Sequence, residues 1–136
     1  DGSVLCLLRT DDGNGVGPLY WAHSTDNGKT WTRPAVFDDL GMWPQMLTLA
    51  NGATLAVYGR PGLYVGATAD PAGRKWEDRV EVVSPHTETC SYSALLPLED
   101  NTALVAYSNF KLPNADGQLC KAIQVRTVTV HRTASP

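Results

Sequence analysis

The sequence lacks any apolar run near the roughly 20 residues that a membrane-spanning helix needs, and helical periodicity is almost absent. It also lacks an excess of basic residues, because 11 Lys and Arg stand against 14 Asp and Glu, for a net charge of −3. Nucleic-acid-binding domains favour basic faces. These absences argue against a membrane segment, a helical bundle and a nucleic-acid partner.

Cysteine is also scarce. The three cysteines, Cys6, Cys90 and Cys120, are an odd number and show no spacing typical of a metal site. We therefore interpret them as small buried residues, and we expect no metal and no cofactor. They leave the cellular compartment open, and a secreted or periplasmic location would suit a parent protein.

What the sequence does contain is a series of short β-rich runs separated by turn signals. About ten such runs can be recognised, beginning with residues 3–9 and ending with residues 122–132, and they include runs at residues 19–24, 31–37 and 76–83. Asn51-Gly52 is typical of a tight hairpin turn. The pattern predicts an all-β chain.

The most informative run is residues 24–31, which read S-x-D-x-G-x-x-W between two strand-like segments. Ser24 and Asp26 carry side-chain oxygens that can bind backbone N–H groups of a turn. Gly28 can adopt the positive φ that a tight turn needs. Trp31 would open the next strand and fold back over the turn as an apolar lid. We assign structural roles to these four residues.

A degraded second copy lies at residues 68–76, where Thr, Asp, Gly and Trp recur with one extra residue before the Gly. Trp31 and Trp76 are 45 residues apart. Four-stranded propeller blades repeat at intervals of roughly 40–50 residues. The interval therefore favours blades, at approximately residues 1–40, 41–85 and 86–136.

These two segments resemble the Asp box, or BNR repeat, of sialidases (neuraminidases) and related β-propellers. The resemblance implies a six-bladed propeller, of which this chain would form about three blades in its C-terminal half. Three blades leave two radial faces open. We therefore expect either that further N-terminal blades belong to the parent or that the chain closes the ring by self-association.

Blade topology gathers several polar residues at one face. Arg9 and Arg60 end the second strands of successive blades, and Tyr92 begins the first strand of the third. Strands alternate in direction, so these three residues are expected around one central depression, opposite the Asp-box turns. Trp43 lies on the same predicted face, where it could stack on a sugar ring.

Two guanidiniums at one point suit a carboxylate, because each can bind it through two parallel hydrogen bonds. The segments around Arg9, Arg60 and Tyr92 resemble sialidase segments with two arginines of the substrate-binding triad and the nucleophilic tyrosine. The resemblance implies an exo-glycoside hydrolase acting on a sialic-acid-like or other acidic glycan, with Tyr92 as nucleophile.

The chain also departs from the sialidase pattern. The triad's first arginine, the aspartate acid/base and the glutamate partner of the tyrosine have no counterpart here, so this chain alone is expected to be inactive. Ser108 stands where many sialidases have Glu. Glu88 is a weak local candidate partner for Tyr92, while Asp38 and Asp39 are interpreted as solvated loop charges or calcium contacts. Two alternatives stay open: a non-catalytic carbohydrate-binding propeller, and a propeller hydrolase or lyase for another acidic sugar.

Overall fold

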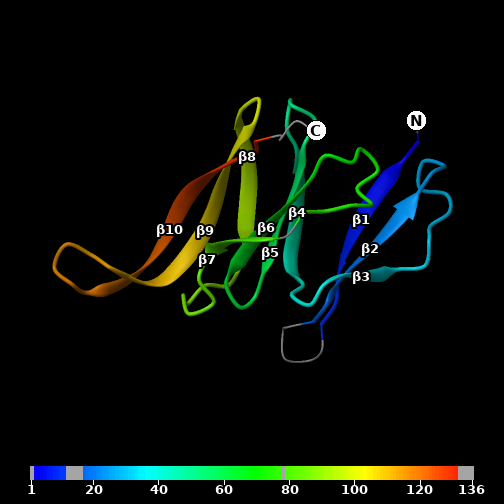
Figure 1. Ribbon diagram of the computed structural model, residues 1–136. Coiled ribbons are helices and arrows are strands. Elements are labelled where there is room, and N and C mark those ends of the chain that lie inside the picture. The colour runs from blue at the N-terminus through cyan, green and yellow to red at the C-terminus, as the bar shows by residue number, and fades with distance from the viewer. Residues whose placement is uncertain (1, 12–16, 78, 132–136) are drawn as a thin grey trace.

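The computed structural model describes residues 2–11, 17–77 and 79–131, and this part of the chain contains strands but no helix (Figure 1). Its ten strands form three antiparallel sheets. The predictions of an all-β chain and of three antiparallel sheets are therefore confirmed. No helix within the described ranges is long and apolar enough to cross a membrane.

Each sheet consists of strands that follow one another in the sequence and pair with their chain neighbours, so that the sheets occupy residues 4–38, 42–83 and 93–129 in turn. The strands are β1 (Val4–Arg9), β2 (Leu19–Ser24) and β3 (Ala35–Asp38) in the first sheet, β4 (Met42–Thr48), β5 (Thr54–Gly59), β6 (Leu63–Thr68) and β7 (Val80–Val83) in the second, and β8 (Ser93–Glu99), β9 (Thr102–Pro113) and β10 (Leu119–Thr129) in the third.

The second sheet lies between the other two and packs on both faces, as alternation along β5 shows. Leu55 belongs to a core that includes Val105 of β9. The next residue, Ala56, points the other way, and with Tyr58 it packs against Leu19 of β2. Burial of both faces explains why β5 is apolar along most of its length. Each fully buried leucine contributes about 1.5–3 kcal/mol to stability.

The third sheet is covered on one face only. Leu95 of β8 packs against the shared core, so its neighbour Leu96 points to the opposite face, where it is 56% exposed. The strand register puts Ile123 and Val125 of β10 on that same face. These two side chains are 75% and 57% exposed. The uncovered side of this sheet is therefore apolar.

Residues 24–31 and 68–76, which we call the first and second Asp box for their resemblance alone, both lie in connections between strands, and the first forms the connection between β2 and β3. The Ser24 hydroxyl donates to Asp26 Oδ1 at 2.8 Å and accepts from the Gly28 N–H at 2.8 Å. Asp26 also accepts from the N–H and the hydroxyl of Thr30, at 2.9 and 2.6 Å. Gly28 has a φ of 82°, and the Trp31 indole N–H donates to its carbonyl at 3.0 Å. The side chains thus close the turn on itself.

The second Asp box, between β6 and β7, repeats this bonding scheme despite its extra residue. The Thr68 hydroxyl accepts from the N–H of Asp70 at 3.0 Å. Asp70 in turn accepts from the Arg74 N–H at 2.9 Å, and the Trp76 indole N–H donates to Gly73 at 2.8 Å. The two turns therefore share the aspartate and indole hydrogen bonds, but the Thr68 hydroxyl donates to the Lys75 carbonyl whereas that of Ser24 donates to Asp26.

In both boxes the tryptophan belongs to the turn rather than to the strand that follows. The prediction that Trp31 opens a strand is wrong, since β3 begins at Ala35, and the strand expected from Trp76 begins at Val80. The indole bond back to the glycine carbonyl holds each tryptophan over the turn. The pairing of β2 with β3 starts only at the Trp21–Ala35 pair.

The cysteines are all free, and the prediction of three buried residues is wrong for Cys120. Cys120 is exposed on β10, where its Sγ donates to the Leu112 carbonyl at 3.0 Å. It is exposed because β10 is an edge strand of the sheet with the uncovered face. Cys6 and Cys90 are partly buried.

The Asp boxes predict a loss of stability in acid. Hydrogen bonds from the Thr30 side chain, the Thr30 backbone and Ser24 lower the pKa of Asp26 from 3.8 to about 2. Backbone hydrogen bonds from Ala72 and Arg74 also lower the pKa of Asp70. A depressed folded pKa stabilises the fold above the unfolded value, and this contribution is lost as pH falls through the folded pKa. Stability should therefore decline between about pH 4 and pH 2.

Urea unfolding across this pH range, with an NMR titration of the Asp26 carboxyl carbon, measures the effect. Asp26→Asn should reduce the loss of unfolding free energy at low pH. Asp116→Asn, in the turn between β9 and β10, should leave that loss unchanged. An Asp26 carboxyl that titrates at or above pH 3.8 would contradict the prediction.

Candidate functional site

Four strand ends meet at one edge of the three sheets, which we call the site edge. In Figure 1 it lies on the lower side of the view, where β1 and β5 end and β4 and β8 begin. The β4–β5 and β8–β9 turns lie at the opposite edge and are joined by a hydrogen bond from the Asn51 N–H to the Asp100 carbonyl, at 2.9 Å. The antiparallel order thus separates the site edge from these turns.

Two aromatic side chains stack at the site edge. The rings of Trp43, in β4, and Tyr92, which precedes β8, have centroids 4.4 Å apart and an interplanar angle of 22°. Both side chains are exposed, by 40% and 43%. The stack joins the second and third sheets and covers one face of each ring. The exposed parts of the two side chains can contact a ligand.

The backbone around this stack is unusual. Trp43, Arg60 and Ser91 have φ angles of 47°, 79° and 59°, and they account for all but one of the non-glycine residues with positive φ in the described ranges. A non-glycine residue in this region costs of order 1–3 kcal/mol and persists only where surrounding contacts enforce it. Such residues gather at ligand-binding sites, so this grouping marks the site edge as a candidate site.

Contacts from two loops hold Arg60 and Tyr92 in place. Arg60 Nη2 donates to the Cys90 carbonyl at 2.8 Å, which fixes the guanidinium beside the segment that carries Tyr92. The buried Ser91 hydroxyl donates to the Gly62 carbonyl at 2.9 Å. The loop after β5 and the loop before β8 therefore support each other.

Arg9 lies at the end of β1, the strand that contacts β4. Its guanidinium is 3.8 Å from the Asp11 carboxylate. The described contacts bring Trp43, Arg60 and Tyr92 together, and we call these three residues the Trp43 cluster. Convergence of Arg9 on the same depression stays a prediction.

Sequence reasoning missed the role of Ser108. Its hydroxyl lies 3.1 Å from the Thr89 hydroxyl and accepts from the Cys90 N–H at 3.3 Å. Ser108 thus anchors the segment leading to Tyr92 from β9, at the position where the resemblance expects a glutamate. Glu88, the weak candidate partner of Tyr92, instead forms an ion pair with Lys111.

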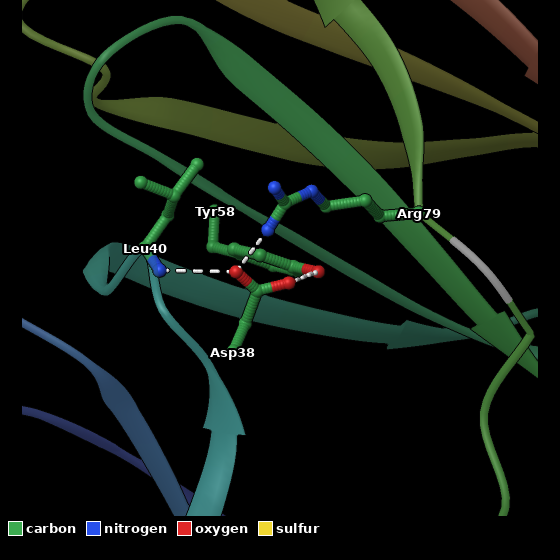
Figure 2. Close-up of polar contacts among 4 residues, drawn as sticks. All are labelled: Asp38, Leu40, Tyr58 and Arg79. Carbon is green, nitrogen blue, oxygen red and sulfur yellow. Dashed lines mark hydrogen bonds and ion pairs between the residues drawn. The ribbon is translucent and has the colours of Figure 1, made fainter.

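A second polar cluster lies between the first and second sheets (Figure 2). Asp38 Oδ2 accepts from the Tyr58 hydroxyl at 2.9 Å, and Oδ1 accepts from the Leu40 N–H at 3.0 Å and pairs with Arg79. Burial, followed by the hydrogen bond to Asp38, raises the pKa of Tyr58. The bond to Asp38 also raises the pKa of Arg79.

The interpretation of Asp38 as a solvated loop charge is therefore wrong. Its side chain is only 12% exposed, because β3 packs against the second sheet and turns this carboxylate toward Tyr58. Asp39, the next residue, is exposed. No group of three or more His, Cys, Asp or Glu side chains within the described ranges could hold a metal ion.

No family model matches the chain, and no curated protein matches it. The chain is similar to the crystal structure of a protein of unknown function from Dyadobacter fermentans DSM 18053, with a TM-score of 0.64 and 22% identity. The match covers 94% of this chain and 35% of that protein. This likeness shows the fold alone, and this chain spans about a third of the length of that protein.

Proposed function

We propose that this chain binds an acidic glycan at the site edge. The observation that carries the proposal is the exposed stack of Trp43 and Tyr92 next to the anchored guanidinium of Arg60. An aromatic face suits the apolar face of a sugar ring, and a guanidinium suits a carboxylate, which it can bind through two parallel hydrogen bonds. Arg9, at the end of a neighbouring strand, would supply a second guanidinium.

We further propose that the three sheets are consecutive blades of a β-propeller. In support, β4 of the second sheet contacts both β8 and β1, and the positions of the Asp boxes make β1 the equivalent of β5, the second strand of a blade. The Asp boxes occupy equivalent connections in two successive sheets. The exposed apolar face of the third sheet, with Leu96, Ile123 and Val125, would receive the next blade, from the parent protein or from a second copy.

Within that propeller, hydrolysis of a sialic-acid-like sugar is the catalytic form of the proposal. Tyr92 would attack the anomeric carbon while the arginines hold the adjacent carboxylate, and the glycosidic oxygen would leave with a proton from an acid of the parent protein that has no counterpart here; water would then release the sugar from the tyrosine. Tyr92 is accessible to a substrate, because 43% of the residue is exposed. Binding without hydrolysis is the second candidate, and the tight anchoring of Ser108 where a glutamate is expected favours it.

A titration of this chain with N-acetylneuraminic acid, followed through the Trp43 indole N–H signal by NMR, tests the binding proposal. Loss of one charge-assisted contact of about 1.5–3 kcal/mol should weaken binding roughly ten- to a hundredfold in Arg60→Ala. Arg126→Ala, on the exposed part of β10, is the matched control and should bind like the unchanged chain. Equal binding of galactose, or unchanged binding by Arg60→Ala, would contradict the proposal.

The same samples distinguish the two candidate functions. A fluorogenic sialoside should not be turned over by this chain alone, because the resemblance assigns the acid/base to a residue without a counterpart here. Turnover that Tyr92→Phe abolishes would overturn that expectation and assign the nucleophile. Binding without turnover in a full-length parent would favour the non-catalytic function.

A further inference from the structure

A pocket of about 530 Å³ lies between the first and second sheets, apart from the Trp43 cluster. Its walls come from β2 and β3 on one side and from β5, β6 and the end of the second Asp box on the other. Its volume is within the range of about 300–1,000 Å³ that is typical of small-molecule sites. It shares no lining residue with the Trp43 cluster, so a ligand here would be a separate one.

The aromatic wall of this intersheet pocket is held rigidly. The Trp76 indole N–H donates to the Gly73 carbonyl at 2.8 Å, and its ring meets Phe37 edge-on, with centroids 5.1 Å apart. Phe37 in turn meets Tyr58 edge-on at 5.5 Å. Trp76 is nevertheless only partly buried. A ligand would therefore find a fixed and accessible indole, with little ordering needed on binding.

The floor of the pocket is open because residue 66 is glycine. A Cβ at Gly66 would lie 3.5 Å from Trp76 Cε3 and 3.9 Å from the Tyr58 hydroxyl, which are ordinary contact distances. The residue does not need a glycine conformation, since its φ is outside the positive range. A side chain would fit here without strain and would project into the space beside the indole.

The charged side chains of the pocket divide into a paired set and an unpaired set. Asp38 and Arg79 neutralise each other within the network of Figure 2. The side chains of Arg74 and Glu77 also line the pocket, and neither takes part in an ion pair between residues that the structure describes. The pocket thus offers one donor-rich and one acceptor group beside an aromatic face.

We propose that the intersheet pocket binds a neutral pyranose ring of a glycan. A sugar of this kind has an apolar C–H face for Trp76 and hydroxyl groups that can accept from Arg74 and donate to Glu77. An acidic ligand would find no excess of positive charge here, because Asp38 neutralises Arg79 and Glu77 offsets Arg74. A wholly apolar ligand would strip water from Arg74 and Glu77 without replacing their hydrogen bonds, which is costly.

The four tryptophans make the test direct, because each contributes one indole N–H signal and they occupy different places in the fold. On titration with methyl β-D-glucopyranoside, the signals of Trp76 and Trp21, both in the pocket, should move, and those of Trp31 and Trp43 should stay. Binding of N-acetylneuraminic acid at the site edge would move Trp43 instead. Failure of one proposal is therefore distinguishable from failure of the other.

Gly66→Ala should weaken binding of the glucoside at least about tenfold by filling the floor, with the unfolding temperature essentially unchanged. Glu77→Gln should weaken it less, and Lys75→Gln, an exposed neighbour outside the pocket, should bind normally. Three results would overturn the proposal. The first is that the signals of Trp76 and Trp21 do not move, and the second is that folded Gly66→Ala binds the glucoside as the unchanged chain does. The third is that galacturonic acid binds at Trp76 with the same affinity as the neutral glucoside.

Discussion

Asp38→Ala is expected to lower the free energy of unfolding by about 3 kcal/mol. The substitution removes the shared partner of Tyr58 and Arg79, which joins the first sheet to the second. The buried Tyr58 hydroxyl would then lose the acceptor of its proton, at a cost of about 1–3 kcal/mol. Arg79 would lose its ion pair, but its side chain is 39% exposed and can turn to water. The loss of stability should therefore lie near the lower end of the roughly 3–5 kcal/mol that is typical when one partner of a buried ion pair is removed.

Asp39→Ala is the control, because Asp39 is adjacent, carries the same charge and is exposed. It should change stability by less than about 0.5 kcal/mol in urea unfolding. In a double-mutant cycle, Tyr58→Phe should recover about 1 kcal/mol of the loss in Asp38→Ala, since it removes the orphaned hydroxyl. If Asp38→Ala and Asp39→Ala are equally stable, the network of Figure 2 does not hold the sheets together.

This network also marks the limit of what the sequence predicts. The strands follow from local signals, namely apolar runs between turn residues, and the predicted β2 has the same bounds as the observed strand. Asp38 is 20 residues from Tyr58 and 41 from Arg79. No local pattern indicates that these three residues meet, because their contact depends on how the two sheets pack.

Strand starts after the Asp boxes are harder to predict for a different reason. An aromatic residue after a turn favours a strand, so the local pattern places Trp31 in one. The indole bond to the Gly28 carbonyl outweighs that preference and holds Trp31 in the turn. In the same way, the indole bond from Trp76 to the Gly73 carbonyl holds Trp76 in the turn, and β7 begins only at Val80.

At the site edge, topology predicts more than composition does. Alternation of strand direction is enough to expect Trp43 and Tyr92 at one edge, but not that their rings stack. Trp43 itself and Ser91, the neighbour of Tyr92, have left-handed backbone conformations. Positive φ at non-glycine residues has no reliable sequence signal, so the way in which the loops support the candidate site emerges only from the structure.

Gly62, in the loop after β5, is a position where a substitution should change both the stability of the fold and the support of the candidate site. It has a φ of 72°, and a Cβ on it would lie 2.6 Å from the Val83 carbonyl oxygen and 3.0 Å from the Pro85 nitrogen. Its carbonyl accepts the hydroxyl of Ser91. An added methyl group must push the loop after β5 away from the end of β7, and this movement would pull on the segment that carries Tyr92.

Gly52 supplies a matched comparison, because its φ of 82° is equally left-handed but nothing lies within 4 Å of the position that a Cβ would occupy. Gly52→Ala should therefore lose only the conformational term, about 1–2 kcal/mol. Gly62→Ala should lose that term and about 1–3 kcal/mol more from crowding, or about 2–5 kcal/mol in total. Urea unfolding of the two variants measures the difference between them.

The Trp43 indole signal decides whether the crowding reaches the candidate site. Ring currents from Tyr92 set that signal, so it should move in Gly62→Ala and stay in Gly52→Ala. If Gly62→Ala is too unstable to study, Ser91→Ala removes the hydroxyl that joins the two loops, at a cost of about 1 kcal/mol, and should move the same signal. Equal stability of the two glycine variants, with Trp43 unmoved in Gly62→Ala and Ser91→Ala, would show that the stack forms independently of the loop after β5.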